Sequence, residues 1–314
     1  MKNVRKLTEG AILLAAFTVL LLVCIYVPII GGILNLFLPL PFILFATKNN
    51  LKNTCVFVFA SILLSFITGA IVALPLTLAY GLTGAIMGYF IQKNKSRTII
   101  LLAGTVVFLV NIVIQYVVTT TFFHFDIIDK FIKMFHESLK IYSQTLKDMG
   151  KEKQGKPIID RLEKSLDLIK IIVPSVFVMS SFLAVFFIQL LSRPVLKRFG
   201  VKVENWKPFR EISLPKSLMW YYLITMMANL TLHPVSGTYL YNALVNLTYI
   251  LQMFMFFQGL TFIFYFFYQR GMPKSIPLII FLFSLTNSNF LYIIGILGII
   301  DLGFDVRRRF LKKE

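Results

Sequence analysis

Charged residues are scarce in this sequence. They make up 15% of its 314 residues, whereas a soluble domain carries about a quarter. Histidine occurs three times and cysteine twice, and the patterns GxSxG, HExxH, CxxC and the Walker A loop are all missing. Three scattered histidines do not predict a metal site. We therefore expect a protein that is not an enzyme and that uses neither a metal nor another cofactor.

Long apolar runs are what the sequence has instead. Hydrophobic residues make up 57% of the chain, phenylalanine alone occurs 32 times, and charge-free blocks cover residues 11–30, 98–123 and 243–267. A helix needs about 20 such residues to cross a bilayer, and it satisfies its own backbone donors and acceptors there. The alternation expected of a membrane β-barrel is absent. The sequence predicts an all-α polytopic membrane protein.

Nine apolar segments follow one another along the chain. The last is interrupted by Asn287-Ser288-Asn289 and is either one crossing or a hairpin. One crossing would put the basic tail of residues 307–313 outside the cytosol, against the usual bias of basic residues, whereas a hairpin with arms of about 11–12 residues keeps it inside. We therefore expect about eight full transmembrane helices and a short C-terminal helical hairpin. The predicted segments cover residues 10–30, 33–47, 54–74, 75–91, 98–123, 169–192, 216–233, 242–268 and 276–300.

The positive charge lies in short loops between these segments rather than on one exposed domain. The net charge is +18, and one alternate set of loops, together with both termini, holds 22 basic and six acidic residues. Basic loops tend to stay in the cytosol, so we expect a protein of the bacterial cytoplasmic membrane with both termini cytosolic. The lipid bilayer is then its partner, and no nucleic acid is expected.

Residues 124–168 are expected outside the cytosol, where nine basic and eight acidic residues nearly cancel. Apolar side chains recur there at steps of three and four, which predicts an amphipathic helix. A break at Gly150, Gly155 and Pro157 separates it from a second helix that begins at Ile158. The resulting extracytoplasmic helical hairpin is either a surface connector or a lid over a pocket. Its apolar stripe consists of Ile128, Phe131, Ile132, Phe135, Leu139, Tyr142, Leu146 and Met149.

Uncharged polar side chains at membrane depth are the main candidates for a binding site. Asn111, Gln115 and Thr119 follow at steps of four and therefore share one face of the fifth segment. Such groups commonly bridge helices. Alternatively, they line an outward-facing pocket for a small neutral solute, because no buried charge is available to balance an ion. Asn242 and Asn246 share a face of the eighth segment in the same way.

Two carboxylates, Asp301 and Asp305, share a helix face near the end of the chain, just before Arg307–Arg309. A carboxylate pair beside a membrane can bind a metal ion. More often such groups pair with nearby arginines or cap a helix, and we expect one of these roles here.

Small residues at helical spacing occur on two segments. Ala11 and Ala15 form such a pair on the first segment, and Gly81, Gly84 and Gly88 form a series on the fourth. Small side chains let two helix backbones approach closely in a membrane. These segments are therefore predicted to take part in close helix packing.

The N-terminal part resembles the substrate-binding S components of energy-coupling-factor transporters, over roughly residues 7–120. The resemblance rests on the stretch from Leu7 to Ala16, on Pro28, Gly31-Gly32 and Leu38-Pro39-Leu40-Pro41, and on Gly81 to Gly88. It implies a six-helix unit that binds solutes from the outer side. It also implies that Ala11 and Ala15 dock a partner membrane protein, because they match the small-residue motif position by position.

This resemblance predicts the organisation of the chain. Residues 1–192 would form the six-helix unit with 124–168 as an insertion, residues 193–215 a basic cytoplasmic loop, and residues 216–314 the C-terminal membrane helices and basic tail. The chain departs from S components in continuing well past the sixth helix and in its longer fifth-to-sixth connection.

The whole chain more closely resembles the YybS-type membrane proteins of Gram-positive bacteria. That resemblance rests on Leu214-Pro215, Gln258-Gly259 and the terminal stretch from Gly298 to Arg307. Two functions remain open at this point: a solute-binding membrane protein, such as a transporter component, or a non-transporting partner or scaffold protein. A polar outer cavity containing Asn111 and Gln115 would favour the first, and tight packing there the second.

Overall fold

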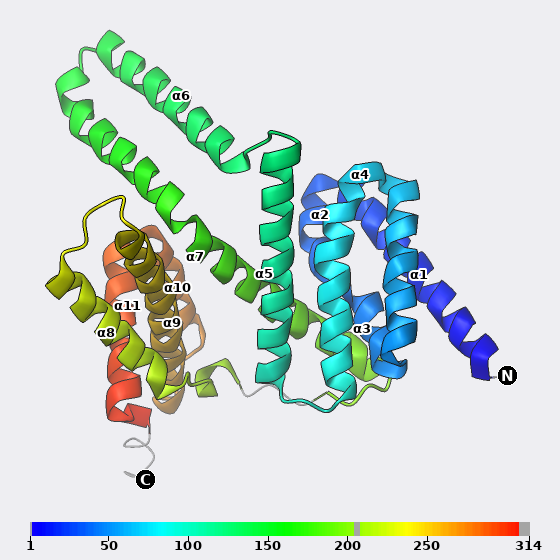
Figure 1. Cartoon of the computed structure of the whole chain (residues 1–314). Helices are drawn as coiled ribbons and strands as arrows, with labels where there is room; N and C mark the ends of the chain where they lie inside the picture. The colour runs from blue at the N-terminus through cyan, green and yellow to red at the C-terminus, as the bar shows by residue number, and fades with distance from the viewer. Residues whose placement is uncertain (1, 204–207, 308–314) are drawn as a thin grey trace. The chain divides into compact units, whose positions relative to one another are not determined.

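The computed structural model describes residues 2–203 and 208–307, and each regular element in these ranges is a helix (Figure 1). Seven helical segments of the described chain are long and apolar enough to cross a membrane. The prediction of an all-α multi-pass membrane protein is thereby confirmed. One of the eight expected crossings, α8 (Lys216–Leu232), has 17 residues, slightly fewer than the about 20 that a full crossing takes.

The chain divides into two compact units. Unit 1 comprises residues 1–155 and 176–204, and unit 2 comprises residues 156–175 and 205–314. Helix α7 (Glu152–Arg198) contributes to both. Its last turns also occupy the start of the predicted basic loop, so the loop proper begins after Arg198 rather than at residue 193.

Unit 1 begins with the straight helix α1 (Lys2–Tyr26), followed by a composite second crossing. That crossing consists of α2 (Pro28–Leu34), the 3₁₀ turn η1 (Asn35–Phe37) and α3 (Pro39–Lys48). Proline lacks an N–H and is tolerated in the first turn of a helix, which is where Pro28 and Pro39 lie. These two prolines thus mark helix starts in this segment.

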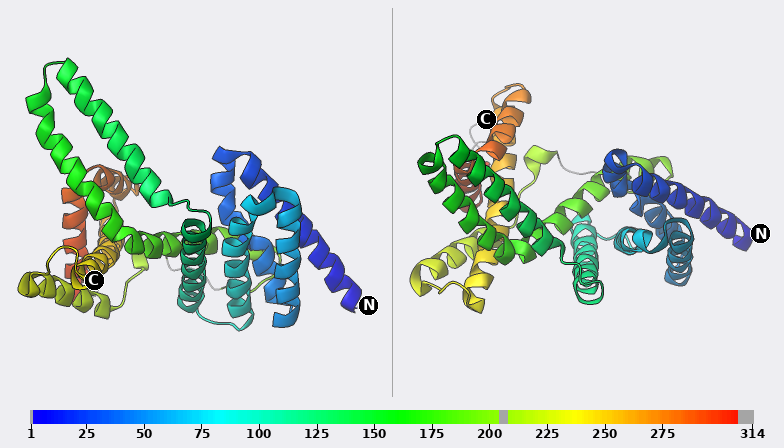
Figure 2. Two further views of the ribbon diagram at one scale, coloured as in Figure 1. Left: turned by 45° about the horizontal axis from the view of Figure 1, so that its top comes forward. Right: turned by 90° about the horizontal axis from the view of Figure 1, so that it is seen from above.

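Helix α4 (Leu51–Gln92) folds back on itself and supplies two crossings. The hydroxyl oxygens of Ser65 and Thr77 lie 2.6 Å apart, although 12 residues of straight helix would span about 18 Å. Figures 1 and 2 show the two arms running side by side. The bend lies near Gly69, ahead of the predicted boundary at residues 74–75, so Pro75 belongs to the second arm.

Close backbone contact and phenylalanine packing hold α3 against α4. A Cβ added at Gly84 would lie 2.5 Å from the carbonyl oxygen of Pro39, and one at Gly88 would lie 2.7 Å from that of Ile43. The predicted close approach at this glycine series is confirmed. The buried core of unit 1 lies beside the crossing and consists of Phe17, Leu21, Cys24, Leu38, Phe42, Phe45, Phe57 and Ala73.

The remaining helices of unit 1 are α5 (Arg97–Phe122), α6 (Ile127–Asp148) and part of α7. Asp126 caps α6 by accepting hydrogen bonds from the backbone N–H groups of Ile128 and Asp129. The predicted break at Gly155 and Pro157 is wrong, because α7 already begins at Glu152. Only Gly150, with a φ of +70°, is needed for the turn, and Pro157 interrupts a single hydrogen bond early in a long helix.

Unit 2 contains α8, α9 (Tyr239–Gln269), α10 (Ser275–Thr286) and α11 (Ser288–Phe304). The predicted C-terminal hairpin is confirmed, since Asn287 separates α10 from α11 and its side chain accepts a hydrogen bond from Asn289 N–H at 3.0 Å. Phe283 and Phe290 meet edge to face across the turn. The second arm is longer than expected, at 17 residues.

Candidate functional site

The three residues predicted to bind a solute all donate hydrogen bonds to backbone carbonyls. Asn111 Nδ2 donates to Val107 O at 2.8 Å and Thr119 Oγ1 to Gln115 O at 2.7 Å, both within α5. Gln115 Nε2 donates to Pro75 O in α4 at 2.9 Å. Only the Gln115 contact bridges two helices, and the other two stay within α5. Binding of a solute by these residues stays a prediction.

The predicted docking residues Ala11 and Ala15 are exposed on α1. A different face of the helix carries Phe17 and Leu21, which are fully buried in the core of unit 1. Unit 1 therefore leaves the small-residue face of α1 uncovered.

The structure separates the two carboxylates near the C-terminus and gives each a cationic partner. Asp301 is paired with Arg307, and Asp305 with Lys216 at the start of α8. The expectation that such carboxylates pair with nearby arginines is confirmed for Asp301, whereas Asp305 pairs with a lysine of another helix. Of the predicted arginine partners, Arg308 and Arg309 lie outside the described residues.

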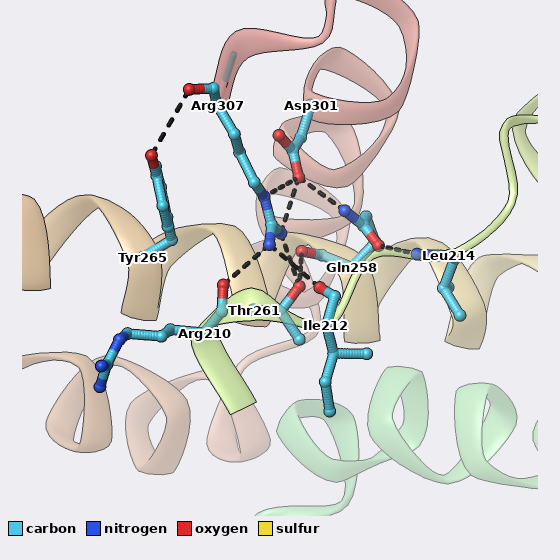
Figure 3. Close-up of polar contacts among 8 residues, drawn as sticks. All are labelled: Arg210, Ile212, Leu214, Gln258, Thr261, Tyr265, Asp301 and Arg307. Atoms are coloured by element: carbon cyan, nitrogen blue, oxygen red, sulfur yellow. Dashed lines mark hydrogen bonds and ion pairs between the residues drawn. The ribbon is translucent and has the colours of Figure 1, made fainter. Parts of the chain in front are cut away.

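The Asp301–Arg307 pair is the centre of a buried polar network in unit 2 (Figure 3). Arg307 Nε and Nη2 both lie 2.8 Å from Asp301 Oδ2. The side chain of Arg307 is 13% exposed, and that of Asp301 is 2% exposed. Burying two charges is expensive, and their attraction repays the cost only when further hydrogen bonds complete the geometry.

Gln258 of α9 extends the network on the carboxylate side. Its Nε2 donates to Asp301 Oδ2 at 2.6 Å, and its Oε1 accepts from the backbone N–H of Leu214 at 2.8 Å. Both ends of this fully buried amide are therefore satisfied. Gln258, a residue of α9, thus links α11 to the segment that leads into α8.

Arg307 extends the network on the other side. Its Nη1 donates to the carbonyls of Arg210 and Ile212 at 2.8 and 3.0 Å, and its Nη2 donates to Thr261 Oγ1 at 2.8 Å. All three guanidinium nitrogens are engaged. The two carbonyls belong to the 3₁₀ turn η2 (Phe209–Glu211) and to its C-cap residue, so Arg307 fixes the position of this turn.

Two glycines bring the helices that carry this network into contact. A Cβ added at Gly259 would lie 1.9 Å from Ile294 O, and one at Gly298 would lie 2.1 Å from Met255 O. No larger residue fits at either position without a shift of backbone. The close crossing of α9 and α11 places Gln258 within reach of Asp301.

A second polar contact in unit 2 lies at Pro174, where α7 lacks one backbone donor. Asn246 of α9 accepts from Ser175 N at 2.9 Å through Oδ1 and donates to Ile171 O at 2.7 Å through Nδ2. An undisturbed helix would pair these two backbone groups with each other. Asn246 thus bridges two helices, as expected of polar groups at depth.

Sequence reasoning named Arg307 among the possible partners of Asp301, but it missed Gln258 and the backbone carbonyls that Arg307 also binds. Gln258 is a single polar residue among apolar ones. The signal was present in another form, because the three stretches that carry the resemblance to YybS-type proteins contain Leu214, Gln258, Asp301 and Arg307. The structure brings these three stretches together.

Comparison with known proteins gives a family match and a similar protein over nearly the whole chain. The family described as "Predicted membrane protein (DUF2232)" matches residues 15–302, a range that contains Leu214, Gln258 and Asp301. The chain is 33% identical over 310 residues to "Uncharacterized protein YybS" of Bacillus subtilis (strain 168), covering 98% of this chain and 99% of that protein. No solved structure matches the chain.

Proposed function

We propose that this chain, which belongs to the family of predicted membrane proteins (DUF2232) that matches residues 15–302, is a membrane-embedded partner protein. It assembles with another membrane protein through one face of α1, and its role is not catalytic. The orientation proposed with it puts both termini in the cytosol, as the basic loops predict.

The exposed small-residue face of α1 carries this proposal. Ala11 and Ala15 are exposed, while Phe17 and Leu21 on a different face are buried. Lipid offers no hydrophobic gain for helix association, so membrane helices associate where small side chains let their backbones approach. The first turns of α1 also project beyond the other helices of unit 1 in every view (Figures 1 and 2).

A cavity beside this face offers room for side chains of a partner helix. Its volume is about 500 Å³, and its lining includes Ala11 and Leu14 of α1 and Val56 and Ala60 of α4. Apart from Lys6 and Asn53, the lining is apolar. A cavity of this composition fits an apolar transmembrane helix, and we take such a helix of a different protein as its occupant.

The other candidate function, binding of a small solute by unit 1, has less support. It requires Asn111, Gln115 and Thr119 to offer free hydrogen-bonding groups to a ligand. Their amide and hydroxyl donors are engaged with backbone carbonyls instead. A ligand would have to replace these bonds.

The test compares Ala15→Leu with Ala16→Leu. Both residues are exposed, but position 16 lies about 100° further round the helix. The full chain, extracted from its native membrane in mild detergent, is expected to run as a complex heavier than its own 36.0 kDa. Ala15→Leu should release the chain from this complex without changing its melting temperature, and Ala16→Leu should leave the complex intact.

Four results would contradict the proposal. The complex could survive Ala15→Leu, the variant could lose thermal stability in proportion to the loss of complex, or the wild-type chain could run alone. A mass of twice the chain would identify the occupant as a second copy, which also contradicts a different partner protein.

A further inference from the structure

A cavity of about 280 Å³ lies in unit 2 at the C-terminal end of α9. One side is lined by Phe264, Phe267 and Tyr268 of α9, and the other by the η2 residues Phe209 and Arg210, with Lys274 at the start of α10. Two cations and several aromatic rings therefore face one partly open cavity. Such a combination suits a ligand with an anionic and an apolar part.

The depth of the cavity along α9 indicates what kind of ligand reaches it. Helix α9 has 31 residues and carries no charged side chain, and the cavity lies at its last two turns, next to Gln269 and Arg270. This is where a crossing helix leaves the hydrocarbon and enters the layer of lipid headgroups. Tyrosine and arginine are enriched there.

The guanidinium group of Arg210 is held in place and remains available. It stacks on the ring of Tyr268 with 3.6 Å between the guanidinium carbon and the ring centroid. Its contact with Glu211 is 3.9 Å long, whereas a strong charge-assisted hydrogen bond measures about 2.7–2.9 Å. Stacking occupies a face of the guanidinium plane and leaves the N–H donors at its edge free to point at an anion.

Lys274 supplies the second positive charge. It is exposed, and no ion-pair partner is recorded for it within the described part of the chain. Glu211, which contacts Arg210 at 3.9 Å, has a side chain that is 47% exposed and does not line the cavity. The cavity therefore has a surplus of positive charge.

The buried network of unit 2 fixes the wall that carries Arg210. Arg307 binds the carbonyls of Arg210 and Ile212, and the ring of Phe209 packs edge to face against Phe264 at 5.2 Å. In Figure 3 the side chain of Arg210 extends away from the Arg307 guanidinium, while its carbonyl points toward it. The network thus binds backbone carbonyls at the turn, and the Arg210 side chain remains free to line the cavity.

We propose that this cavity binds the phosphate of an anionic phospholipid, with Arg210 and Lys274 contacting the headgroup and the phenylalanine rings contacting its glycerol and upper acyl chain. Basic pockets between membrane helices bind anionic headgroups in this way. The lipid is chosen over a soluble phosphate ester because all lining residues except Arg210 and Lys274 are apolar or aromatic, and because the site lies at headgroup depth.

The test measures binding of phosphatidylglycerol to the delipidated full chain in a neutral detergent by native mass spectrometry. One retained lipid is expected for the wild type, with phosphatidylcholine binding more weakly. Each cation contributes about 1 kcal/mol near an anionic headgroup, so Arg210→Gln and Lys274→Gln should each weaken binding about fivefold, and together about thirtyfold. Arg270→Gln is the matched control, because Arg270 ends the same helix without lining the cavity.

Melting temperatures without lipid show whether the variants fold, and Lys274→Gln, at an exposed position, keeps the test valid if Arg210→Gln does not fold. If Arg270→Gln and Arg210→Gln weakened lipid binding equally, general surface charge rather than this site would explain the binding. That result would overturn the proposal. Displacement of the lipid by millimolar glycerol phosphate would identify a soluble phosphate ester as the ligand, which also overturns it.

Discussion

In unit 1 helix α3 crosses α4, and in unit 2 helix α9 crosses α11. The two crossings share one structural feature. Both bring helix backbones together at glycines, Gly84 and Gly88 in the first and Gly259 and Gly298 in the second. The first is completed by phenylalanine packing, with Phe42 in edge contact with Phe17 and Phe57. The second is completed by a buried ion pair and its hydrogen bonds.

This difference determines which amino-acid substitutions each crossing tolerates. Apolar packing is lost gradually, roughly in proportion to the atoms removed. A buried ion pair fails abruptly, because removing one partner leaves the other charge buried and uncompensated. Unit 2 should therefore be the more sensitive to single polar substitutions, and unit 1 to changes of volume.

Asp301→Leu should have the largest effect. It leaves the Arg307 guanidinium buried without a counter-charge, which costs about 3–5 kcal/mol of folding free energy. The measurement is the free energy of unfolding of the full chain in detergent. The matched control is Asp305→Asn, whose partner Lys216 is largely exposed and which should cost at most about 1 kcal/mol.

The double variant Asp301→Leu/Arg307→Leu refines this prediction. Removing both charges should recover a large part of the stability, because no uncompensated charge remains. If Asp301→Leu proves no worse than Asp305→Asn, the buried network does not distinguish unit 2 from unit 1.

Sequence patterns predict the part of this comparison that depends on local rules. Lipid requires long apolar helices, so the crossings are visible as charge-free runs. A turn needs its own capping group, so Asn287 predicts the C-terminal hairpin. The glycine series of α4 likewise predicts a close approach of helices.

The network in unit 2 could not be predicted by these rules. Gln258 meets Asp301 across 43 positions and Leu214 across 44, and nothing in the spacing of one helix indicates which partner the other provides. The predicted break at Pro157 failed for a related reason. A proline near the start of a long helix costs one hydrogen bond, which the rest of α7 outweighs.

Gly259→Ala and Gly298→Ala should have the next largest effect. The new Cβ atoms would lie 1.9 and 2.1 Å from backbone carbonyl oxygens, which forces the helices apart. Overpacking of this kind costs about 1–3 kcal/mol, and more where backbone must move. Thermal unfolding of the two variants in detergent measures the loss.

Gly295→Ala provides the control on the same helix, because a Cβ there would meet nothing within 4 Å. It should be neutral or slightly stabilising, since alanine favours helix over glycine by about 1 kcal/mol. Equal destabilisation by Gly295→Ala and Gly298→Ala would mean that glycine flexibility, rather than close contact of α9 with α11, sets the stability.

Gln115→Leu should have the smallest effect and probes unit 1. Its amide makes one described hydrogen bond between helices, to Pro75 O, and such bonds contribute on average about 0.6 kcal/mol in a membrane protein. Asn229→Leu in unit 2 is a matched control, because Asn229 also donates to a partner on a neighbouring helix, Thr248, at 3.1 Å. Both variants should lower the melting temperature slightly and to a similar extent.

The same experiment tests the solute site predicted on α5, if melting is repeated with vitamins and nucleobase-like solutes. A ligand that binds the folded chain raises its melting temperature by mass action. A solute that stabilises the wild type and the Asn229→Leu chain, but not the Gln115→Leu chain, would show that Gln115 gives up its bond to Pro75 for a ligand. Unit 1 would then be the solute-binding part of the molecule, and its polar contacts would be more than links between helices.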